Sequence, residues 1–179
     1  MVLHRVILLL FLSDFLYYVL RQSVESEVQP VTDTVNLGAG DDYLLGEAGE
    51  DTISGGSGSD ILVGVLGNDI LTGDYGADIF AWVDVENGAV DRIKDFTVDE
   101  DILDLSEVLE GVTFNDISEL LDMIPDDNQV GVISIEDSQT GAALTINQDG
   151  KSMSIEFDGM NAADLTSYLF EQGGLKASD

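Results

Sequence analysis

The sequence contains no cysteine and only one histidine. Without cysteine, the chain can form neither a disulfide framework nor a thiolate metal site. The single histidine, His4, lies near the amino terminus, which excludes almost every histidine-based catalytic arrangement and the usual zinc sites. The HExxH motif of zinc proteases and the GxSxG elbow of hydrolases do not occur either. We therefore expect a protein that is not an enzyme.

Positive charge is also scarce, because 6 Lys and Arg residues stand against 36 Asp and Glu residues, for a formal net charge of −30. Such a chain repels itself when it is compact, and it should avoid nucleic acid and anionic membranes. Yet 44% of the residues are hydrophobic, which is more than a disordered acidic tail carries. The composition therefore predicts a chain that folds when something neutralises its carboxylates, and cations are the first candidate.

Residues 1–20 differ from the rest of the chain. His4 and Arg5 precede an apolar run over residues 6–12, which is the order of a secretory signal. However, no clear small-x-small cleavage site follows, and Asp14 would be costly at the centre of a membrane span. Three interpretations stay open: a signal-like or anchoring segment, an artefact of the start site or of a fragment, and a packed helix. Contact with a membrane is expected only if the segment is a genuine signal or anchor.

A nine-residue period runs through residues 37–81. The five units read LGAGDDYLL, GEAGEDTIS, GGSGSDILV, GVLGNDILT and GDYGADIFA. The fourth position is always glycine, the sixth is always aspartate and the eighth is always large and apolar. Because glycine makes up about 7% of residues in an average protein, five glycines in five fixed places would arise by chance only about once in a million trials. The period therefore reflects a repeated structural unit.

The period predicts a coil of two units. Positions seven to nine of each unit are short and β-prone, so they suit a three-residue strand. The glycines before them permit a tight turn through left-handed backbone angles. Two units then form an 18-residue coil with a strand on each side and a turn at each end. Stacked coils would pair their strands in parallel, with the eighth-position side chains pointing inward as an aliphatic column.

The same stacking brings carboxylates together at the turns. Asp42, Asp60 and Asp78 would lie on one edge, and Asp51 and Asp69 on the other, with about 4.8 Å between successive coils. Carboxylates that close would repel each other or take up protons. A hard cation resolves the repulsion, and Ca²⁺ suits the site because it takes six to eight oxygen ligands, which carboxylates and glycine carbonyls can supply. Mg²⁺ fits less well, and nitrogen or sulfur ligands for zinc or copper are not near.

These units resemble the RTX (repeats-in-toxin) nonapeptide GGxGxDxUx, the hemolysin-type calcium-binding repeat. The resemblance covers 45 of the 179 residues and implies a parallel β-roll with Ca²⁺ between units i and i+2, at the aspartate pairs 42/60, 60/78 and 51/69. The predicted metal-binding residues are the aspartates Asp42, Asp51, Asp60, Asp69 and Asp78 and the turn glycines Gly38, Gly40, Gly49, Gly56, Gly58, Gly67 and Gly76. The units depart from the consensus at Leu37 in the first position and at Glu47, Val65 and Asp74 in the second.

The segment VDRIKDFTVDEDILDLS follows the repeats and resembles the one that follows RTX repeats in type I-secreted proteins, of the form DxIxDF…DxIDLS. The matching residues are Asp91, Ile93, Asp95, Phe96, Asp101, Leu103, Asp104, Leu105 and Ser106. The resemblance implies a cap on the open end of the roll, which a solenoid needs to avoid an exposed sheet edge. The spacing of Val90, Ile93 and Phe96 predicts one apolar face. We interpret Asp99, Asp101 and Asp104 as solvated turn acids rather than as ligands of another ion.

The rest of the chain predicts a small α+β unit. A capping box at Asp116 and Glu119 predicts a short helix to Met123, ended by Pro125. Alternating residues over 130–136, 142–147 and 152–157 predict a three-stranded meander with a hairpin turn at 149–150. Asn161 is expected to cap a final helix that a glycine pair, 173–174, terminates. The region looks like the secretion-target region of type I substrates, whose uncleaved signal is read by an inner-membrane ABC transporter.

The expected fold is mostly β: a parallel β-roll followed by a small α+β cap. We divide the chain into a hydrophobic amino-terminal segment with a linker (1–30), a calcium-binding β-roll (31–81), and a cap with the secretion target (82–179). The resemblance implies a calcium-binding RTX module that folds on Ca²⁺ after type I secretion, extracellular or at the cell surface of a Gram-negative bacterium. The alternative is the tail of a larger RTX adhesin or of an RTX hydrolase, such as a protease or lipase, whose active part is not in this sequence.

Overall fold

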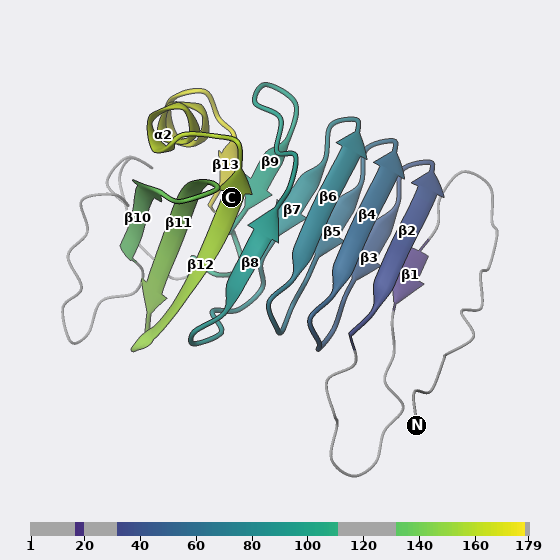
Figure 1. Cartoon of the computed structure of the whole chain (residues 1–179), viewed down its shortest axis with the longest axis horizontal. Helices are drawn as coiled ribbons and strands as arrows, with labels where there is room; N and C mark the ends of the chain where they lie inside the picture. Colours follow the sequence, from purple (N-terminus) through teal and green to yellow (C-terminus); the bar gives the residue numbers. More distant parts are fainter. Residues whose placement is uncertain (1–16, 20–31, 111–131, 178–179) are drawn as a thin grey trace, which may run out of the picture.

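A computed structural model describes residues 17–19, 32–110 and 132–177, and it contains two sheets. Figure 1 shows them as the two faces of a roll whose strands follow one another along its length. The first sheet runs in the order β10 (Val132–Asp137), β11 (Gly141–Gln148), β12 (Lys151–Asp158), β8 (Val90–Ile93), β6 (Ile70–Tyr75), β4 (Thr52–Ser57), β2 (Thr34–Ala39). The second runs β1 (Tyr17–Val19), β3 (Tyr43–Leu45), β5 (Ile61–Val63), β7 (Ile79–Ala81), β9 (Ile102–Asp104), β13 (Leu175–Lys176).

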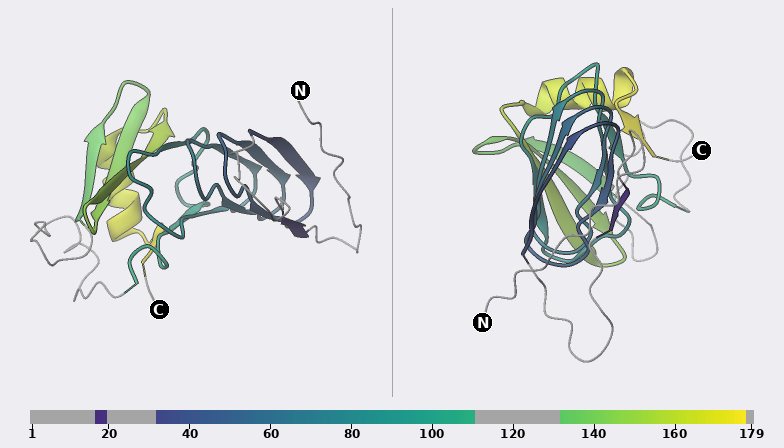
Figure 2. Two further views of the ribbon diagram at one scale, coloured as in Figure 1. Left: turned by 90° about the horizontal axis from the view of Figure 1, so that it is seen from below. Right: turned by 90° about the vertical axis from the view of Figure 1, so that its right-hand side faces the viewer.

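The strands of the repeats pair in parallel with partners 18 residues away. Leu44 lies opposite Leu62 in one sheet, and Ile53 lies opposite Leu71 in the other. Viewed end-on, successive coils lie over one another (Figure 2). The predicted 18-residue coil and its parallel β-roll are therefore confirmed.

The two faces of the roll differ in strand length. On one face, β3, β5 and β7 are three residues long and coincide with positions seven to nine of their units, as predicted. On the other face, β2, β4 and β6 are six residues long. The extra residues come from the turn, where the backbone of Gly38 still pairs with Gly56, and Gly56 with Asp74. The expected three-residue strand is thus too short for this face.

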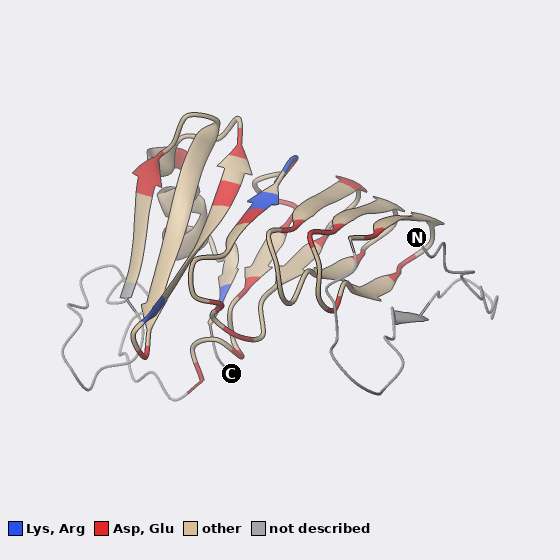
Figure 3. Ribbon diagram, turned by 60° about the horizontal axis from the view of Figure 1, so that its bottom comes forward, with Lys and Arg blue, Asp and Glu red and all other residues tan. Residues whose placement is uncertain are grey.

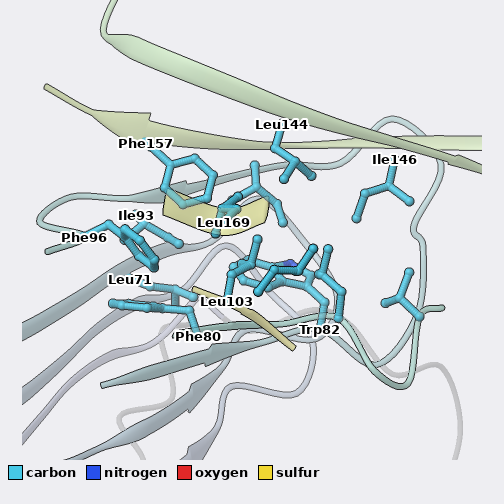
Figure 4. Close-up of a cluster of buried hydrophobic side chains, with 14 of the residues drawn as sticks. Leu71, Phe80, Trp82, Ile93, Phe96, Leu103, Leu144, Ile146, Phe157 and Leu169 are labelled. Atoms are coloured by element: carbon cyan, nitrogen blue, oxygen red, sulfur yellow. The ribbon is translucent and has the colours of Figure 1, made fainter. Parts of the chain in front are cut away.

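The core of the roll is a single inward column. The eighth-position side chains Leu44, Ile53, Leu62, Leu71 and Phe80 are all 0% exposed. An aromatic cluster closes the column at its carboxyl end. The centroid of the Phe96 ring lies 5.9 Å from that of Phe80 and 5.3 Å from that of Phe157 (Figure 4). The centroid of the Tyr168 ring also lies 5.9 Å from that of Phe96. The cap therefore packs directly onto the last coil.

The segment after the repeats continues both sheets. Strand β8 pairs in parallel with β6, and β9 pairs in parallel with β7. The division at residue 81 stays a prediction, but the two sheets run across it. The predicted apolar face of this segment is wrong at one position, because Val90 is 45% exposed whereas Ile93 and Phe96 are buried. Strand β8 alternates, so residue 91 turns inward and residue 90 outward.

The predicted meander is confirmed: β10, β11 and β12 pair antiparallel in sequence, and β12 adds to β8 in parallel. The final helix is also confirmed as α2 (Ala162–Glu171), because the Asn161 side chain accepts a hydrogen bond from the Asp164 backbone N–H. The helix predicted to end at Met123 lies outside the described residues.

Ion pairs also join the meander to the segment that follows the repeats. The Asp158 carboxylate on β12 accepts from Arg92 Nε and from Lys94 Nζ, each at 2.6 Å.

The packed-helix interpretation does not fit residues 17–19, which form strand β1 beside β3. Among the described residues, no helix is both long and apolar enough to cross a membrane.

Leu62 tests the inward column, because it is fully buried in the middle coil. We expect Leu62→Ala to lower the free energy of unfolding, measured in calcium by urea denaturation, by about 2–5 kcal/mol. The matched control is Ile61→Ala on the same strand, whose side chain is only partly buried and should cost less. Equal losses for the two variants would contradict the inward column.

Candidate metal centre in the stacked turns

Buried aspartates form a row along each edge of the roll. The side chains at the sixth position of the units, Asp42, Asp51, Asp60, Asp69 and Asp78, are at most 3% exposed. Figure 3 shows acidic residues recurring from coil to coil along the roll, while the described Lys and Arg residues lie on or near β8 and in the carboxyl-terminal part. The rows therefore combine burial with negative charge.

A ladder of hydrogen bonds holds each row in register. The Oδ1 atom of Asp60 accepts the backbone N–H of Asp42 at 2.8 Å, and that of Asp78 accepts the N–H of Asp60 at 2.9 Å. On the other edge, Asp69 Oδ1 accepts the N–H of Asp51 at 2.9 Å. The structure thus brings together the three predicted pairs, each on one edge and one coil apart.

The second carboxylate oxygen is the unusual feature. The Oδ2 atoms of Asp51, Asp60 and Asp69 are buried and have no hydrogen-bond partner in the described structure. A buried polar atom without a partner is costly, and a buried charge more so. Within the described ranges, no cluster of three or more His, Cys, Asp or Glu side chains is arranged to hold a metal. An ion here would therefore need backbone oxygens as well as carboxylates.

Glycines at the first position of the units bring backbone oxygens to these carboxylates. A Cβ atom added to Gly46 would lie 2.7 Å from the Gly64 carbonyl oxygen and 2.9 Å from Asp51 Oδ2. A Cβ on Gly55 would contact Asp60 Oδ2 and lie 3.0 Å from the Gly73 carbonyl oxygen. Each space is thus bordered by a carboxylate from one coil and a carbonyl from the next, which are oxygen ligands of the kind that Ca²⁺ takes.

The first-position glycines are absent from the predicted set of site residues. Their signal was present in the sequence, because four consecutive units begin with glycine. The glycines that were predicted have another place in the turn: all seven have positive φ, from 99° at Gly38 to 156° at Gly49. At the fourth position, a Cβ on Gly58 would contact the Gly40 carbonyl oxygen of the preceding coil. Their part in binding an ion stays a prediction.

Burial changes the acidity of the rows. Loss of solvation is the main cause that raises the pKa of Asp51 and of Asp78 to about 6, and the pKa of Asp69 to about 7. The pKa of Asp60 is raised for the same reason. Backbone hydrogen bonds oppose the shift, and neighbouring carboxylates such as Asp91 beside Asp69 add to it. Without a cation, the folded rows therefore favour protonation.

Two further aspartates extend the rows beyond the repeats. Asp91 Oδ1 accepts the backbone N–H of Asp69 at 2.9 Å, and Asp101 Oδ1 accepts that of Asp78 at 3.0 Å. Both side chains are buried. The interpretation of Asp101 as a solvated turn acid is therefore wrong, whereas Asp99 is exposed as expected. The nine-residue period does not predict these two members, because Asp91 follows Asp69 by 22 residues and Asp101 follows Asp78 by 23 residues, in place of 18.

Asp104 does not join the rows. It is partly buried, and its carboxylate accepts hydrogen bonds from Ser106 and from Lys176 Nζ. These donors lower the pKa of Asp104, in contrast to the raised values in the rows.

The non-glycine residues at the second position adopt the same left-handed backbone conformation as the consensus glycines. Glu47, Val65 and Asp74 occupy the second position with φ of 73°, 85° and 69°, where the other units have Gly38 and Gly56. For a β-branched residue such as Val65, this conformation is strained.

One family model matches the repeats of this chain. The model of the RTX calcium-binding nonapeptide repeat (4 copies) matches residues 32–62 and 54–81. Two similar solved structures are the AlgE6R3 and AlgE6R2 subunits of the mannuronan C5-epimerase from Azotobacter vinelandii, each 22% identical to this chain. The first covers 83% of this chain and 80% of its own, with a TM-score of 0.49. The second covers 83% and 89%, with a TM-score of 0.41. No match occurs among curated proteins.

Val65 tests the strain in the turn. We expect Val65→Gly to raise the free energy of unfolding in calcium by about 1 kcal/mol, because glycine adopts positive φ without a steric cost. The control is the neighbouring exposed residue, Leu66→Gly, which has no positive φ and should destabilise by about 0.5–1 kcal/mol through chain entropy. Urea unfolding measures both changes, and a destabilising Val65→Gly would contradict the strain.

The raised pKa values predict a pH dependence in chelator. In the folded chain, burial raises the pKa of Asp51 and Asp78 to about 6 and that of Asp69 to about 7, whereas the ordinary value is 3.8. Between these values the folded state binds more protons, so stability is greatest near pH 4 and is lost as the pH rises through 6 to 7. We expect the β signal in circular dichroism to grow from pH 8 to pH 5, and Asp69→Asn to weaken this dependence. A signal that falls on acidification would refute it.

Proposed function

We propose that this chain, an RTX calcium-binding protein, is the calcium-folded module of a secreted protein. Residues 32–81 carry RTX calcium-binding nonapeptide repeats, so Ca²⁺ is the ion that the turns bind. The observation that carries the proposal is the set of buried carboxylate oxygens at Asp51, Asp60 and Asp69 that have no hydrogen-bond partner in the described structure. A bound cation would compensate these oxygens and remove the repulsion along each row.

The donor set supports calcium between coils. Asp51 Oδ2 with the Gly64 carbonyl, and Asp60 Oδ2 with the Gly73 carbonyl, are oxygen pairs from successive coils of one edge. We assign the proposed sites to the aspartate pairs 51/69, 60/78 and 42/60. In this assignment, the positive-φ glycines shape the turn, and the first-position glycines leave room for the ion.

The proposed mechanism is a folding switch. Where Ca²⁺ is scarce, as in the cytosol, repulsion among the aspartates keeps the repeats unfolded and able to pass a narrow channel. Outside the cell, Ca²⁺ binds the folded roll and stabilises it by mass action. Because each ion would bridge two coils, folding should be cooperative in calcium.

The route of export is part of the proposal. RTX proteins are typically secreted, and we propose that an ABC transporter of a type I system reads the carboxyl-terminal region of this chain in a Gram-negative bacterium. The module would work as a binding unit and not as an enzyme. The alternative is the tail of a larger RTX adhesin or hydrolase, and the reading frame upstream of the gene distinguishes the two.

The switch predicts a large spectroscopic change. We expect the full chain to give a random-coil circular dichroism spectrum in chelator at pH 8, because the rows are charged, and a β spectrum in millimolar Ca²⁺. The same concentration of Mg²⁺ is the control and should produce less structure, because Mg²⁺ demands a stricter octahedral geometry. Identical spectra with chelator and with Ca²⁺ would refute the switch.

The pairing of sites predicts unequal effects within one row. Asp60 belongs to two of the proposed sites and Asp42 to one, so Asp60→Ala should remove two ions and Asp42→Ala one. Calorimetric titration with Ca²⁺ gives the number of ions per chain for each variant. If the two variants lose the same number, the ions do not lie between coils i and i+2.

A further inference from the structure

The carboxylates at the end of each row differ from those inside it. Asp91 ends the row that contains Asp51 and Asp69, and its Oδ1 atom makes the same ladder bond as theirs. Its Oδ2 atom, however, accepts the indole N–H of Trp82 at 2.6 Å. Inside the row, the Oδ2 atoms of Asp51 and Asp69 have no such donor in the described structure. The last carboxylate is therefore satisfied by the protein itself.

Trp82 stands in the column of the first-position glycines. Leu44, Leu62 and Phe80 lie opposite one another in consecutive strands, and Gly46, Gly64 and Trp82 follow each of them by two residues. At Gly64 there is no room for a side chain, because a Cβ atom would contact Asp69 Oδ2. At the last coil the glycine is replaced by the largest side chain, so the space beside the carboxylate is filled.

A longer connection accommodates this side chain. Nine positions separate Trp82 from Asp91, whereas five separate Gly64 from Asp69. Both Trp82 and Asp91 are buried, at 2% and 3% exposure, and the indole ring belongs to the hydrophobic core (Figure 4). The N–H to carboxylate bond is thus shielded from solvent, and such a bond to an ionised carboxylate is of the strong, charge-assisted kind.

The other row ends in the same way. Asp101 Oδ1 accepts the Asp78 backbone N–H, and Asp101 Oδ2 accepts the backbone N–H of Thr97 at 2.8 Å. The hydroxyl of Tyr168 on α2 donates to the Asp101 carbonyl at 2.8 Å, which ties this end to the cap. At both edges a protein N–H therefore donates to the Oδ2 atom of the last carboxylate, whereas Oδ2 of Asp51, Asp60 and Asp69 has no such donor in the described structure.

We propose that Trp82 ends the calcium row on its edge: its indole N–H takes the role of the cation at Asp91, which binds no ion. The inference rests on the proposed calcium function, and it states at which residue the row of calcium sites ends. Asp91 is then a structural member of the ladder, and Trp82 is the positioning residue that makes it independent of calcium.

The number of bound ions tests the proposal. Native mass spectrometry of the full chain in calcium would compare the wild type with Trp82→Phe/Asp91→Asn and with Asp69→Asn. In the double variant, the side-chain oxygen of the new asparagine can still accept the Asp69 N–H, while its amide faces a ring without a donor. We expect the double variant to bind as many ions as the wild type, and Asp69→Asn to bind at least one fewer.

The single variant Trp82→Phe supplies a second measurement. It keeps an aromatic ring but leaves the Asp91 carboxylate buried without its donor, so we expect Tm in calcium to fall by roughly 3–10 °C. Adding Asp91→Asn should restore most of this loss, because the uncompensated charge is removed. A merely space-filling tryptophan would show neither the loss nor the rescue.

The outcomes distinguish a failure of the proposed role of Trp82 from a failure of the proposed calcium function. A double variant that loses one ion relative to a calcium-binding wild type would show that Asp91 is a ligand and overturn the proposal. An unchanged Tm in Trp82→Phe would overturn it independently, even if the double variant did not fold. A wild-type chain that binds no calcium would instead contradict the proposed function on which the inference rests.

Discussion

The rest of the structure depends on one constraint, which is the repulsion between buried carboxylates. The stacking of coils brings carboxylates from successive turns within about one strand spacing of each other. Oδ1 of each inner aspartate is used in the ladder, while Oδ2 of Asp51, Asp60 and Asp69 is left buried beside glycine carbonyls. A buried charge without a partner is costly, so these oxygens favour compensation by a cation or by a proton. Ca²⁺ can supply this compensation through oxygen coordination, and a proton can supply it because burial raises the pKa of Asp51 and Asp78 to about 6 and that of Asp69 to about 7.

The cap is the part of the molecule where the chain compensates its own charges. Asp158 pairs with Arg92 and Lys94, and the two row ends are held by Trp82 and Thr97. The aromatic cluster around Phe96 then covers the last coil of the column. All of the described Lys and Arg residues lie here, so the charge imbalance of the described chain is concentrated in the repeats, where an ion is expected.

Much of the roll and its site could be predicted because a strict period converts sequence position into spatial position. The 18-residue register, the inward column and the two rows all follow from the places of Leu62, Asp60 and their equivalents. The prediction lost accuracy where the period changes. Val90 turns outward because strand β8 alternates, and Asp101 is buried although it follows Asp78 by 23 residues instead of 18. The predictions of the Asn161 cap and of the meander are confirmed although no repeat covers them, because they depend on local sequence patterns.

The sequence by itself determined the coil, the family of the repeats and the ion, because each depends on residue type at a fixed spacing. Only the tertiary structure decided which oxygens are compensated and which are not. That distinction depends on hydrogen bonds outside the repeat pattern, from the Trp82 indole N–H to Asp91 Oδ2 and from the Thr97 backbone N–H to Asp101 Oδ2. The sequence shows an aspartate in the same way whether a cation or an indole N–H faces its carboxylate. Only the packing of the last coil places the Trp82 indole N–H beside Asp91.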